Sequence, residues 1–224
     1  MVTETQVPAG LRSKVLGLPV DVCADVVHAA LGLHGRGGGQ IVTLNAEMTM
    51  AAIEDPALGD VIRAAELVIP DGAGVVWALG RQGYRVRRSP GIELADRLLV
   101  EAAERGWRVA LVGASPTVME RLRERLLRRL PALDLVAAVH GYQSDAAWPG
   151  LEATLHASQP DLVLVALGVP RQETWIADLA GSAAVDTSHM AEALGYRTPA
   201  IGATPSLQAT LQASTQTEHP ARHG

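Results

Sequence analysis

The sequence lacks phenylalanine altogether and holds only three tyrosines and four tryptophans in 224 residues. The core must therefore be built from Val, Leu, Ile and Ala. Cys23 is the only cysteine, which excludes an internal disulfide bond and any metal site with several cysteines, and fits a reducing cytosol. No apolar run reaches the roughly 18 residues that cross a bilayer, and residues 1–10 lack the basic-then-apolar pattern of a signal peptide. We expect a cytoplasmic protein, with peripheral attachment to the inner face of the cell membrane left open.

Several signatures of enzyme chemistry are missing as well. No two aspartates are separated by a single residue, so the usual carboxylate pair that holds a divalent ion on a sugar nucleotide is absent. The histidines fall singly except for His219 and His223, which argues against a zinc site. There is no Gly-x-x-x-x-Gly-Lys loop and no Gly-x-Ser-x-Gly turn, so ATPase and serine-hydrolase functions lack their key residues. We expect no cofactor and no metal, and the net charge of −5 favours no nucleic-acid partner.

What the chain does contain is a series of short apolar runs that alternate with helical patterns. This alternation predicts an α/β fold, a Rossmann-like sheet of mostly parallel strands with helices on both faces. The predicted strands of the sheet are 40–45, 67–70, 107–113, 133–139 and 162–168. The helix predicted over 116–130 carries five arginines beside an apolar stripe. We interpret that stripe as core rather than as a membrane-binding face.

The two ends of the chain differ from its middle. A short strand is predicted over 14–20, with Asp21 capping the helix that follows. The glycine cluster 35–39 comes after a helix and before a strand, the reverse of a dinucleotide fingerprint, so we interpret it as a loop and disfavour a nicotinamide-dependent enzyme.

We expect one Rossmann-like domain over 1–180. The segment 181–224 is expected to be a disordered or loosely helical tail without a strand.

The chain is organised around the stretch Leu67-Val68-Ile69-Pro70-Asp71-Gly72-Ala73-Gly74, where a predicted strand ends and a helix begins. Asp71 is thereby placed at the carboxyl edge of the sheet, where open α/β folds bind their ligands. The two glycines leave room for a ligand to approach the backbone. Asp71 is therefore either a helix cap or a catalytic carboxylate.

Polar residues follow three other predicted strands. They are Thr43 and Asn45, His140 and Tyr142, and Gln172 and Glu173. Because the ends of parallel strands that precede helices meet at one edge of the sheet, these groups and Asp71 together predict a cleft. If the cleft binds phosphate, Arg87 and Arg88 are the best candidates, with a solvated basic loop as the alternative.

These residues lie in separated motifs whose order resembles that of the WecG/TagA/CpsF glycosyltransferase family. The motifs are Thr43-Leu44-Asn45-Ala46-Glu47, Pro70-Asp71-Gly72-Ala73-Gly74, Arg88-Ser89-Pro90-Gly91-Ile92-Glu93-Leu94, Gly141-Tyr142 and Gly168-Val169-Pro170-Arg171-Gln172-Glu173. The resemblance covers residues 11–177. It implies a bacterial, inverting, metal-independent enzyme that transfers N-acetylmannosamine, or a related N-acetylhexosamine, from a UDP donor. The acceptor would be a polyprenyl-diphosphate-linked sugar at the membrane surface, in teichoic acid, common-antigen or capsule synthesis.

The resemblance also implies roles for individual residues. Asp71 would be the catalytic base, and Thr43 and Asn45 would line the same pocket near the reacting sugar. The substrate-binding residues would be Arg88, Gly72, Gly74, Tyr142, Gln172 and Glu173. Among them the arginine would contact the donor diphosphate, which suits a guanidinium when no metal neutralises the charge. The glutamine and glutamate would recognise the uridine.

Two departures from the family pattern matter. Glu93 stands where the family usually has aspartate. Beyond residue 180 the family's glycine-rich strand and arginine-rich appendage are not recognisable, so we expect that strand to be missing from the sheet. The alternative function is therefore a UDP-sugar-binding protein that has lost turnover through its altered C-terminus. The oligomeric state is left open, with a homo-oligomer among the alternatives.

Overall fold

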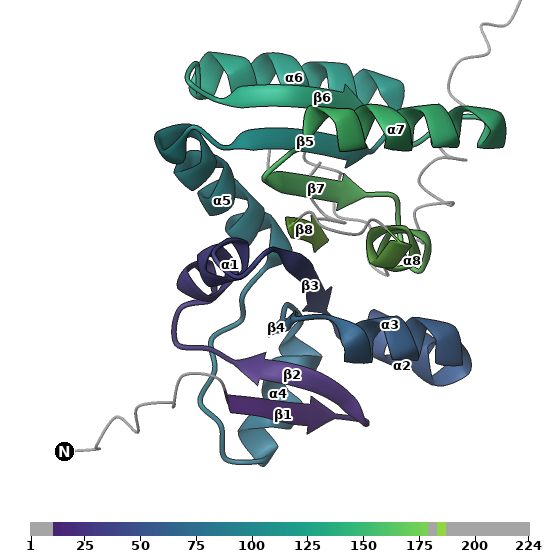
Figure 1. Cartoon of the computed structure of the whole chain (residues 1–224). Helices are drawn as coiled ribbons and strands as arrows, with labels where there is room; N and C mark the ends of the chain where they lie inside the picture. Colours follow the sequence, from purple (N-terminus) through teal and green to yellow (C-terminus); the bar gives the residue numbers. More distant parts are fainter. Residues whose placement is uncertain (1–10, 179–182, 187–224) are drawn as a thin grey trace, which may run out of the picture.

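The computed structural model describes residues 11–178 and 183–186, and its central feature is a parallel sheet. The strands are β1 (Leu11–Val15), β2 (Leu18–Val22), β3 (Gly39–Leu44), β4 (Leu67–Pro70), β5 (Arg108–Gly113), β6 (Asp134–Val139), β7 (Leu162–Ala166) and β8 (Ala183–Asp186). The last six form one sheet in the order β4-β3-β8-β7-β5-β6, and every neighbouring pair in it is parallel (Figure 1). The predicted α/β, Rossmann-like fold is confirmed.

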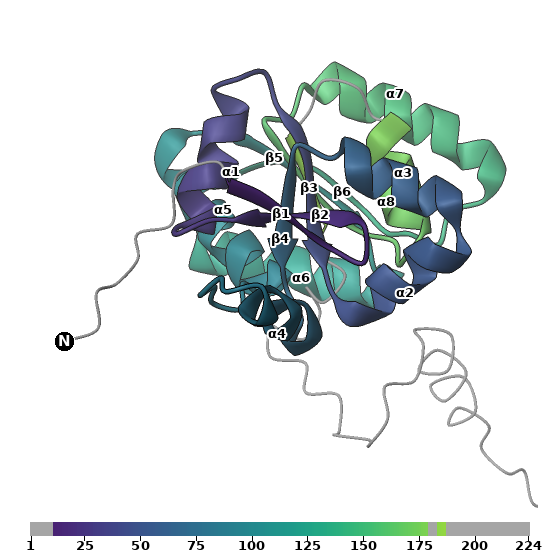
Figure 2. The same ribbon diagram turned by 90° about the horizontal axis from the view of Figure 1, so that it is seen from below.

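Helices connect these strands and cover both faces of the sheet (Figure 2). They are α1 (Val26–His34), α2 (Ala46–Glu54), α3 (Pro56–Ala64), α4 (Ala73–Arg81), α5 (Gly91–Arg105), α6 (Pro116–Arg129), α7 (Trp148–Ser158) and α8 (Arg171–Asp178), with a 3-10 turn η1 (Asp145–Ala147). Because side chains alternate along a strand, neighbouring residues of β3 enter different cores. Ile41 packs with α1 and α5, whereas Val42 packs with α2, α3 and α4. None of the described helices is long and apolar enough to span a membrane.

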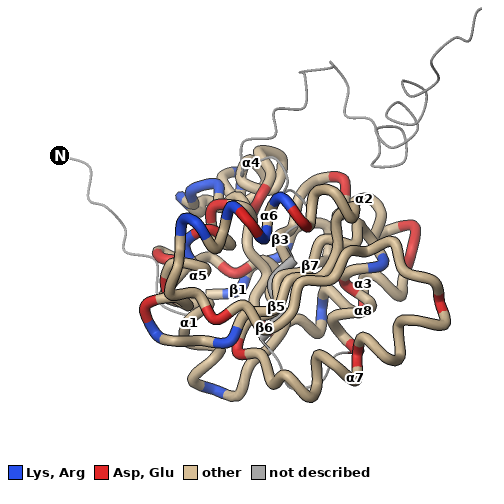
Figure 3. Tube along the Cα trace, turned by 90° about the horizontal axis from the view of Figure 1, so that it is seen from above, with Lys and Arg blue, Asp and Glu red and all other residues tan. Residues whose placement is uncertain are grey.

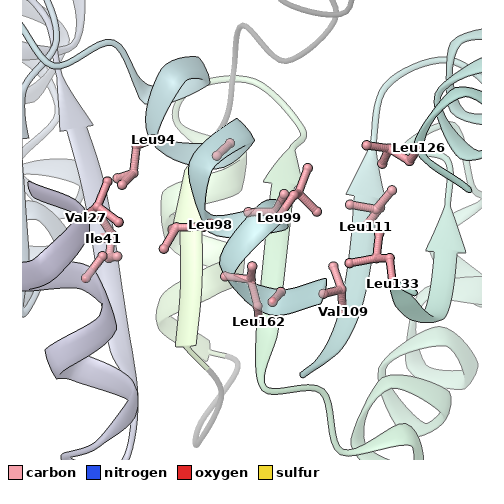
Figure 4. Packing of buried hydrophobic residues seen from close by; sticks show 14 of the residues in the cluster. Val27, Ile41, Leu94, Leu98, Leu99, Val109, Leu111, Leu126, Leu133 and Leu162 are labelled. Atoms are coloured by element: carbon pink, nitrogen blue, oxygen red, sulfur yellow. The ribbon is translucent and has the colours of Figure 1, made fainter. Parts of the chain in front are cut away.

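The largest core lies between the sheet and helices α1, α5 and α6 (Figure 4). Leu98 and Leu99 of α5 are both about 2% exposed and lie between side chains of β3 and of β5. Full burial of a leucine contributes about 1.5–3 kcal/mol, so this helix fastens the two halves of the sheet together. The apolar stripe of α6, which includes Leu122 and Leu126, is buried in the same core. The interpretation of that stripe as core is confirmed.

A β-hairpin closes the molecule beside β4. β1 pairs with β2 in antiparallel register, and the pair packs with α2, α3 and α4 in the second core. Two sequence predictions were wrong here, because the single strand predicted over 14–20 is a hairpin that turns at residues 16–17, and because Asp21 does not cap a helix. Asp21 lies in β2, accepts two hydrogen bonds from the guanidinium of Arg12 and accepts another from the backbone N–H of Val68. The N-cap of α1 is Asp25, whose carboxylate accepts from the backbone N–H groups of Val27 and His28.

The expectation of a strandless segment after residue 180 was also wrong. β8 is an interior strand of the sheet and pairs with β3 on one side and β7 on the other. Its sequence, Ala-Ala-Val-Asp, lacks the large aliphatic residues by which the other strands were predicted. Position in the middle of a sheet, rather than intrinsic apolarity, makes these residues a strand. The remaining residues of the expected tail, 187–224, lie outside the described part of the chain, as do residues 1–10.

Candidate functional site

Asp71 lies directly after β4, at the carboxyl edge of the sheet. Its backbone N–H donates to the carbonyl of Leu44 at 3.0 Å, which continues the pairing with β3 by one residue. The residue is 6% exposed. The helix that follows, α4, has Gly72 as its N-cap, so Asp71 does not occupy the cap position. The sequence left two interpretations of Asp71 open. The helix cap is contradicted, because Gly72 occupies the cap position, and the structure instead shows a nearly buried carboxylate at the end of β4.

Arg88 approaches Asp71 from the loop between α4 and α5. Its Nε donates to the backbone carbonyl of Asp71 at 2.7 Å and lies 3.8 Å from the carboxylate Oδ1. The next residue of the loop, Ser89, donates its backbone N–H to the carbonyl of Pro70 at 2.9 Å. The loop is thus pinned to the end of β4. The arginine side chain is nevertheless 61% exposed, so most of the guanidinium faces solvent beside a nearly buried carboxylate.

Thr43 is held against the amino end of α5. The threonine is 2% exposed on β3. A Cβ added at Gly91 would come within 2.7 Å of the Thr43 Cγ2, closer than such atoms approach in proteins. Only glycine therefore allows α5 to start this close to β3. The sequence shows Gly91 in a motif but does not reveal this role, although its position after Pro90 at a helix start was a usable signal.

Asn45 connects the same strand end to α2 and α4. Its side-chain oxygen accepts from the backbone N–H of Met48 at 2.8 Å, which caps α2. A Cβ added at Gly72 would lie 3.2 Å from the Asn45 Cβ, and one added at Gly74 would lie 3.2 Å from the Ala46 Cβ. The two motifs are therefore in van der Waals contact through their smallest residues.

Two helix amino ends meet at this group without a capping side chain. The N-cap of α4 is Gly72 and that of α5 is Pro90, and neither residue makes a side-chain cap hydrogen bond. Amino ends of helices carry partial positive charge and backbone N–H donors, so they are suited to bind an anion. Together with Arg88 they give this edge of the sheet a positive character around Asp71. Among the described residues there is no group of three or more His, Cys, Asp or Glu side chains that could hold a metal ion.

Gln172 and Glu173 lie at the start of α8, and the structure buries both completely. The amide of Gln172 accepts from the backbone N–H of Gly168 at 3.0 Å and donates to the Glu173 carboxylate at 2.8 Å. The backbone carbonyl of Glu173 accepts from Gln40, a buried polar residue of β3 that sequence analysis did not single out. These bonds fix the loop between β7 and α8. No feature of the sequence indicated that two polar residues after a strand would turn inward.

The motifs assembled at this edge can now be compared with known proteins. The family model described as the glycosyl transferase WecG/TagA/CpsF family matches residues 13–189. The chain belongs to this family. The match includes β8, whose pairing completes the sheet, and every residue assigned to the site from the sequence.

The motifs of this WecG/TagA/CpsF family member fall into two groups on the sheet. Thr43, Asn45, Asp71 and Arg88 meet around β3 and β4, whereas Tyr142 follows β6 at the opposite end. Five strand spacings of about 4.8 Å separate these ends by roughly 24 Å. Tyr142 is 52% exposed, and Gly141 before it lies against Gly113 and Leu167, where its backbone N–H donates to the carbonyl of Ala114 at 2.9 Å. The single cleft expected from the four strand ends stays a prediction.

A groove of about 370 Å³ lies elsewhere, between α1 and α5. Its acidic residues are already engaged in the fold. Asp25 caps α1, Asp96 pairs with Arg129, and Glu101 pairs with Arg105. None of the family motifs lines this groove, so it is not the candidate site of this glycosyltransferase.

Proposed function

We propose that this glycosyltransferase moves N-acetylmannosamine, or a related N-acetylhexosamine, from a UDP donor to a polyprenyl-diphosphate-linked sugar. The reaction inverts the anomeric carbon, needs no metal and serves the synthesis of a bacterial cell-surface polysaccharide or teichoic acid at the cytoplasmic face of the membrane. The observation that carries the proposal is the contact between three family motifs around one nearly buried carboxylate, Asp71, with the exposed guanidinium of Arg88 beside it.

The proposed chemistry is a single displacement. The Asp71 carboxylate takes the proton of the acceptor hydroxyl while the acceptor oxygen forms a bond to the anomeric carbon. On the other side of that carbon the bond to the UDP oxygen breaks, and UDP leaves with the bonding electrons. Thr43 and the amide nitrogen of Asn45 hold the reacting sugar. General-base catalysis of this kind contributes about 10²- to 10⁴-fold to the rate.

The leaving diphosphate is proposed to lie against Arg88 and the amino ends of α4 and α5. A guanidinium forms two parallel hydrogen bonds to a phosphate, and the helix ends supply backbone N–H donors and positive potential. Gly72 and Gly74 allow the start of α4 to lie against Asn45 and Ala46. These groups supply the charge compensation that a divalent cation provides in other sugar-nucleotide enzymes.

Uridine is proposed to bind next along the edge, at the loop before α8. Gln172 and Glu173 are fully buried, so we propose that they act on the uridine through the loop that they hold in place. With Gln172 bonded to Gly168, the pair sets the backbone of the loop that a uracil ring would contact. Tyr142, exposed at the end of β6, offers a ring for stacking at the far end of the donor site.

The first prediction tests the base. Release of UDP from UDP-N-acetylmannosamine is measured with a polyprenyl-diphosphate-N-acetylglucosamine acceptor, with EDTA present. Asp71→Asn should lower kcat about 10²- to 10⁴-fold because the amide cannot take the proton. Calorimetric affinity for UDP should stay close to that of the wild type, since the carboxylate is not proposed to hold the nucleotide. Arg88→Gln is the matched variant and should weaken UDP binding.

Other outcomes separate the alternatives. Unchanged turnover in Asp71→Asn would reject Asp71 as the base, and restoration of activity only by a divalent ion would reject the metal-independent mechanism. UDP binding by the wild type without any turnover would select the alternative function, a sugar-nucleotide-binding protein. Absence of UDP binding would reject both functions.

A further inference from the structure

Trp77 is the most exposed large apolar side chain in the described part of the chain, at 69%. It lies on α4, the helix that begins at the proposed active site. Arg81 follows it by four residues, so both side chains lie on the same side of the helix. With Arg85 and Arg87 of the following loop they make up what we call the Trp77 surface, and all four residues are exposed.

Partly buried and exposed side chains alternate along the loop after α4, and its arginines are among the exposed ones. Tyr84 and Val86 pack against the second core, while Arg85 and Arg87 between and after them are exposed. In an extended segment successive side chains point in opposite directions, so the two buried residues fix the direction of the two arginines. A further contact fastens the end of α4 beneath this loop. Gln82 accepts from the hydroxyl of Ser13 at 2.7 Å and donates to a carbonyl of β1 at 2.8 Å.

The Trp77 surface carries positive charge, whereas the net charge of the whole chain is negative. No aspartate or glutamate occurs between Asp71 and Glu93, whereas the whole chain has a net charge of −5. Within the described residues, Arg81, Arg85 and Arg87 take part in no ion pair, unlike Arg63 and other arginines of the surface. Lys and Arg positions gather beside α4 in Figure 3. The local charge is therefore available to an anionic partner.

We propose that the Trp77 surface docks on an anionic lipid membrane, with the indole at the lipid–water boundary and the guanidinium groups on the headgroups. Tryptophan is favoured at that boundary because its ring is apolar with one polar N–H, and arginines beside it bind anionic headgroups. The inference rests on the proposed function to the extent that a lipid-linked acceptor requires the enzyme at a membrane.

The placement of the surface relative to the site agrees with this partner. α4 has nine residues, so its ends lie roughly 13 Å apart, with Asp71 at one end and Arg81 at the other. The docked enzyme would hold its carboxylate just above the headgroups, where the sugar of a lipid-linked diphosphate lies. A second copy of the chain is a poorer occupant. A two-fold contact through this surface would bring two positively charged surfaces together.

The test is flotation of the full chain with vesicles, at low ionic strength. Vesicles of phosphatidylglycerol and phosphatidylcholine should carry the wild type upward, and pure phosphatidylcholine vesicles should not. Arg81→Gln/Arg85→Gln should lower the partition coefficient about 30-fold, since each arginine near an anionic surface contributes about five-fold. Arg125→Gln/Arg128→Gln on α6 removes the same charge from exposed positions elsewhere and should have little effect. Trp77→Ser should weaken binding, and wild-type fluorescence should be quenched by brominated lipid more than that of Trp77→Ser.

Several results would overturn the inference. They are equal binding to both vesicle types, an equal loss in the two double variants, or a Trp77→Ser variant that changes the oligomeric state in sedimentation but not vesicle binding. Melting temperatures of all variants are compared first, and because the substituted side chains are exposed we expect them unchanged. UDP release with a short-chain, water-soluble acceptor and no vesicles should be unaffected in Arg81→Gln/Arg85→Gln. If the wild type itself shows no UDP release in this assay, that result counts against the proposed function. The vesicle-binding result then still tests the membrane inference by itself.

Discussion

At the scale of single residues, the candidate site depends on how closely backbone segments approach. Asp71 and Thr43 are positioned by two neighbouring glycines, Gly72 and Gly91, which allow close approach because they have no side chain. The packing of the β3–α2 turn, the β4–α4 turn and the start of α5 therefore helps to place the carboxylate. Substitution of a residue that never contacts substrate should then disturb the site.

Gly91→Ala provides the test of that packing. The added methyl group would lie 2.7 Å from the Thr43 Cγ2, so Thr43 or the start of α5 must move. We expect a loss of about 1–3 kcal/mol in the free energy of unfolding, measured by urea denaturation, and a fall in kcat. Gly80→Ala is the matched control, because nothing lies within 4 Å of a Cβ there and alanine should stabilise α4 by about 1 kcal/mol. Gly91→Ala with stability above wild type would contradict the proposed close approach.

At the scale of elements, a set of contacts that we call the clamp joins α1, β5 and β7 at the edge of the sheet opposite the site. His34 from the last turn of α1 lies 3.1 Å from the Asp161 carboxylate, which precedes β7, and stacks on Trp107 before β5. The same carboxylate accepts the backbone N–H of Arg108, the first residue of β5, at 2.9 Å. The clamp joins the end of α1 to the starts of β5 and β7.

The clamp predicts a dependence of stability on pH. Burial alone would raise the pKa of Asp161, but the hydrogen bonds from the Arg108 N–H and His34 outweigh it and leave the pKa below the ordinary 3.8. A lowered pKa stabilises the fold above the unfolded value, and that contribution is lost as the pH falls through the folded value. The melting temperature of Asp161→Asn should therefore lie below that of the wild type at pH 7, and the difference should shrink as the pH falls below about 4 and through the lowered pKa of Asp161. A constant difference from pH 7 to pH 3 would contradict this assignment.

At the scale of the whole molecule, the extent of the domain differs from what the sequence indicated. The strong apolar runs of β3, β4, β5 and β7 were predictable because hydrophobic burial on both faces of a parallel sheet requires them. β8 was not, because a short alanine-rich strand owes its state to neighbours that are distant in the sequence. For the same reason the sequence did not reveal the strand order. The inward turn of Gln172 depends on a partner, Gly168, that only the folded loop supplies.

Truncation tests where the domain ends. A chain of residues 1–180, the boundary expected from the sequence, lacks β8 and leaves β3 and β7 each without a partner on one side. Unpaired interior strands cost their ladder hydrogen bonds and invite aggregation. We expect this chain to lose cooperative thermal unfolding by circular dichroism, while the chain of residues 1–189, which retains the family match, keeps it. Equal, cooperative transitions in both would show that β8 is dispensable.

The interior position of the last strand also orders events in time. Residue 39 pairs with residue 183, so the sheet cannot be completed until most of the chain has left the ribosome. The hairpin with β3 and β4, and the group β5, β6 and β7, can each form earlier from contacts nearer in sequence. We expect β8 to join the sheet last and slowly, because the contacts it makes are remote along the chain. Until β8 pairs, β3 and β7 each have an unpaired edge. We therefore expect the nascent protein to depend most on chaperones at this stage.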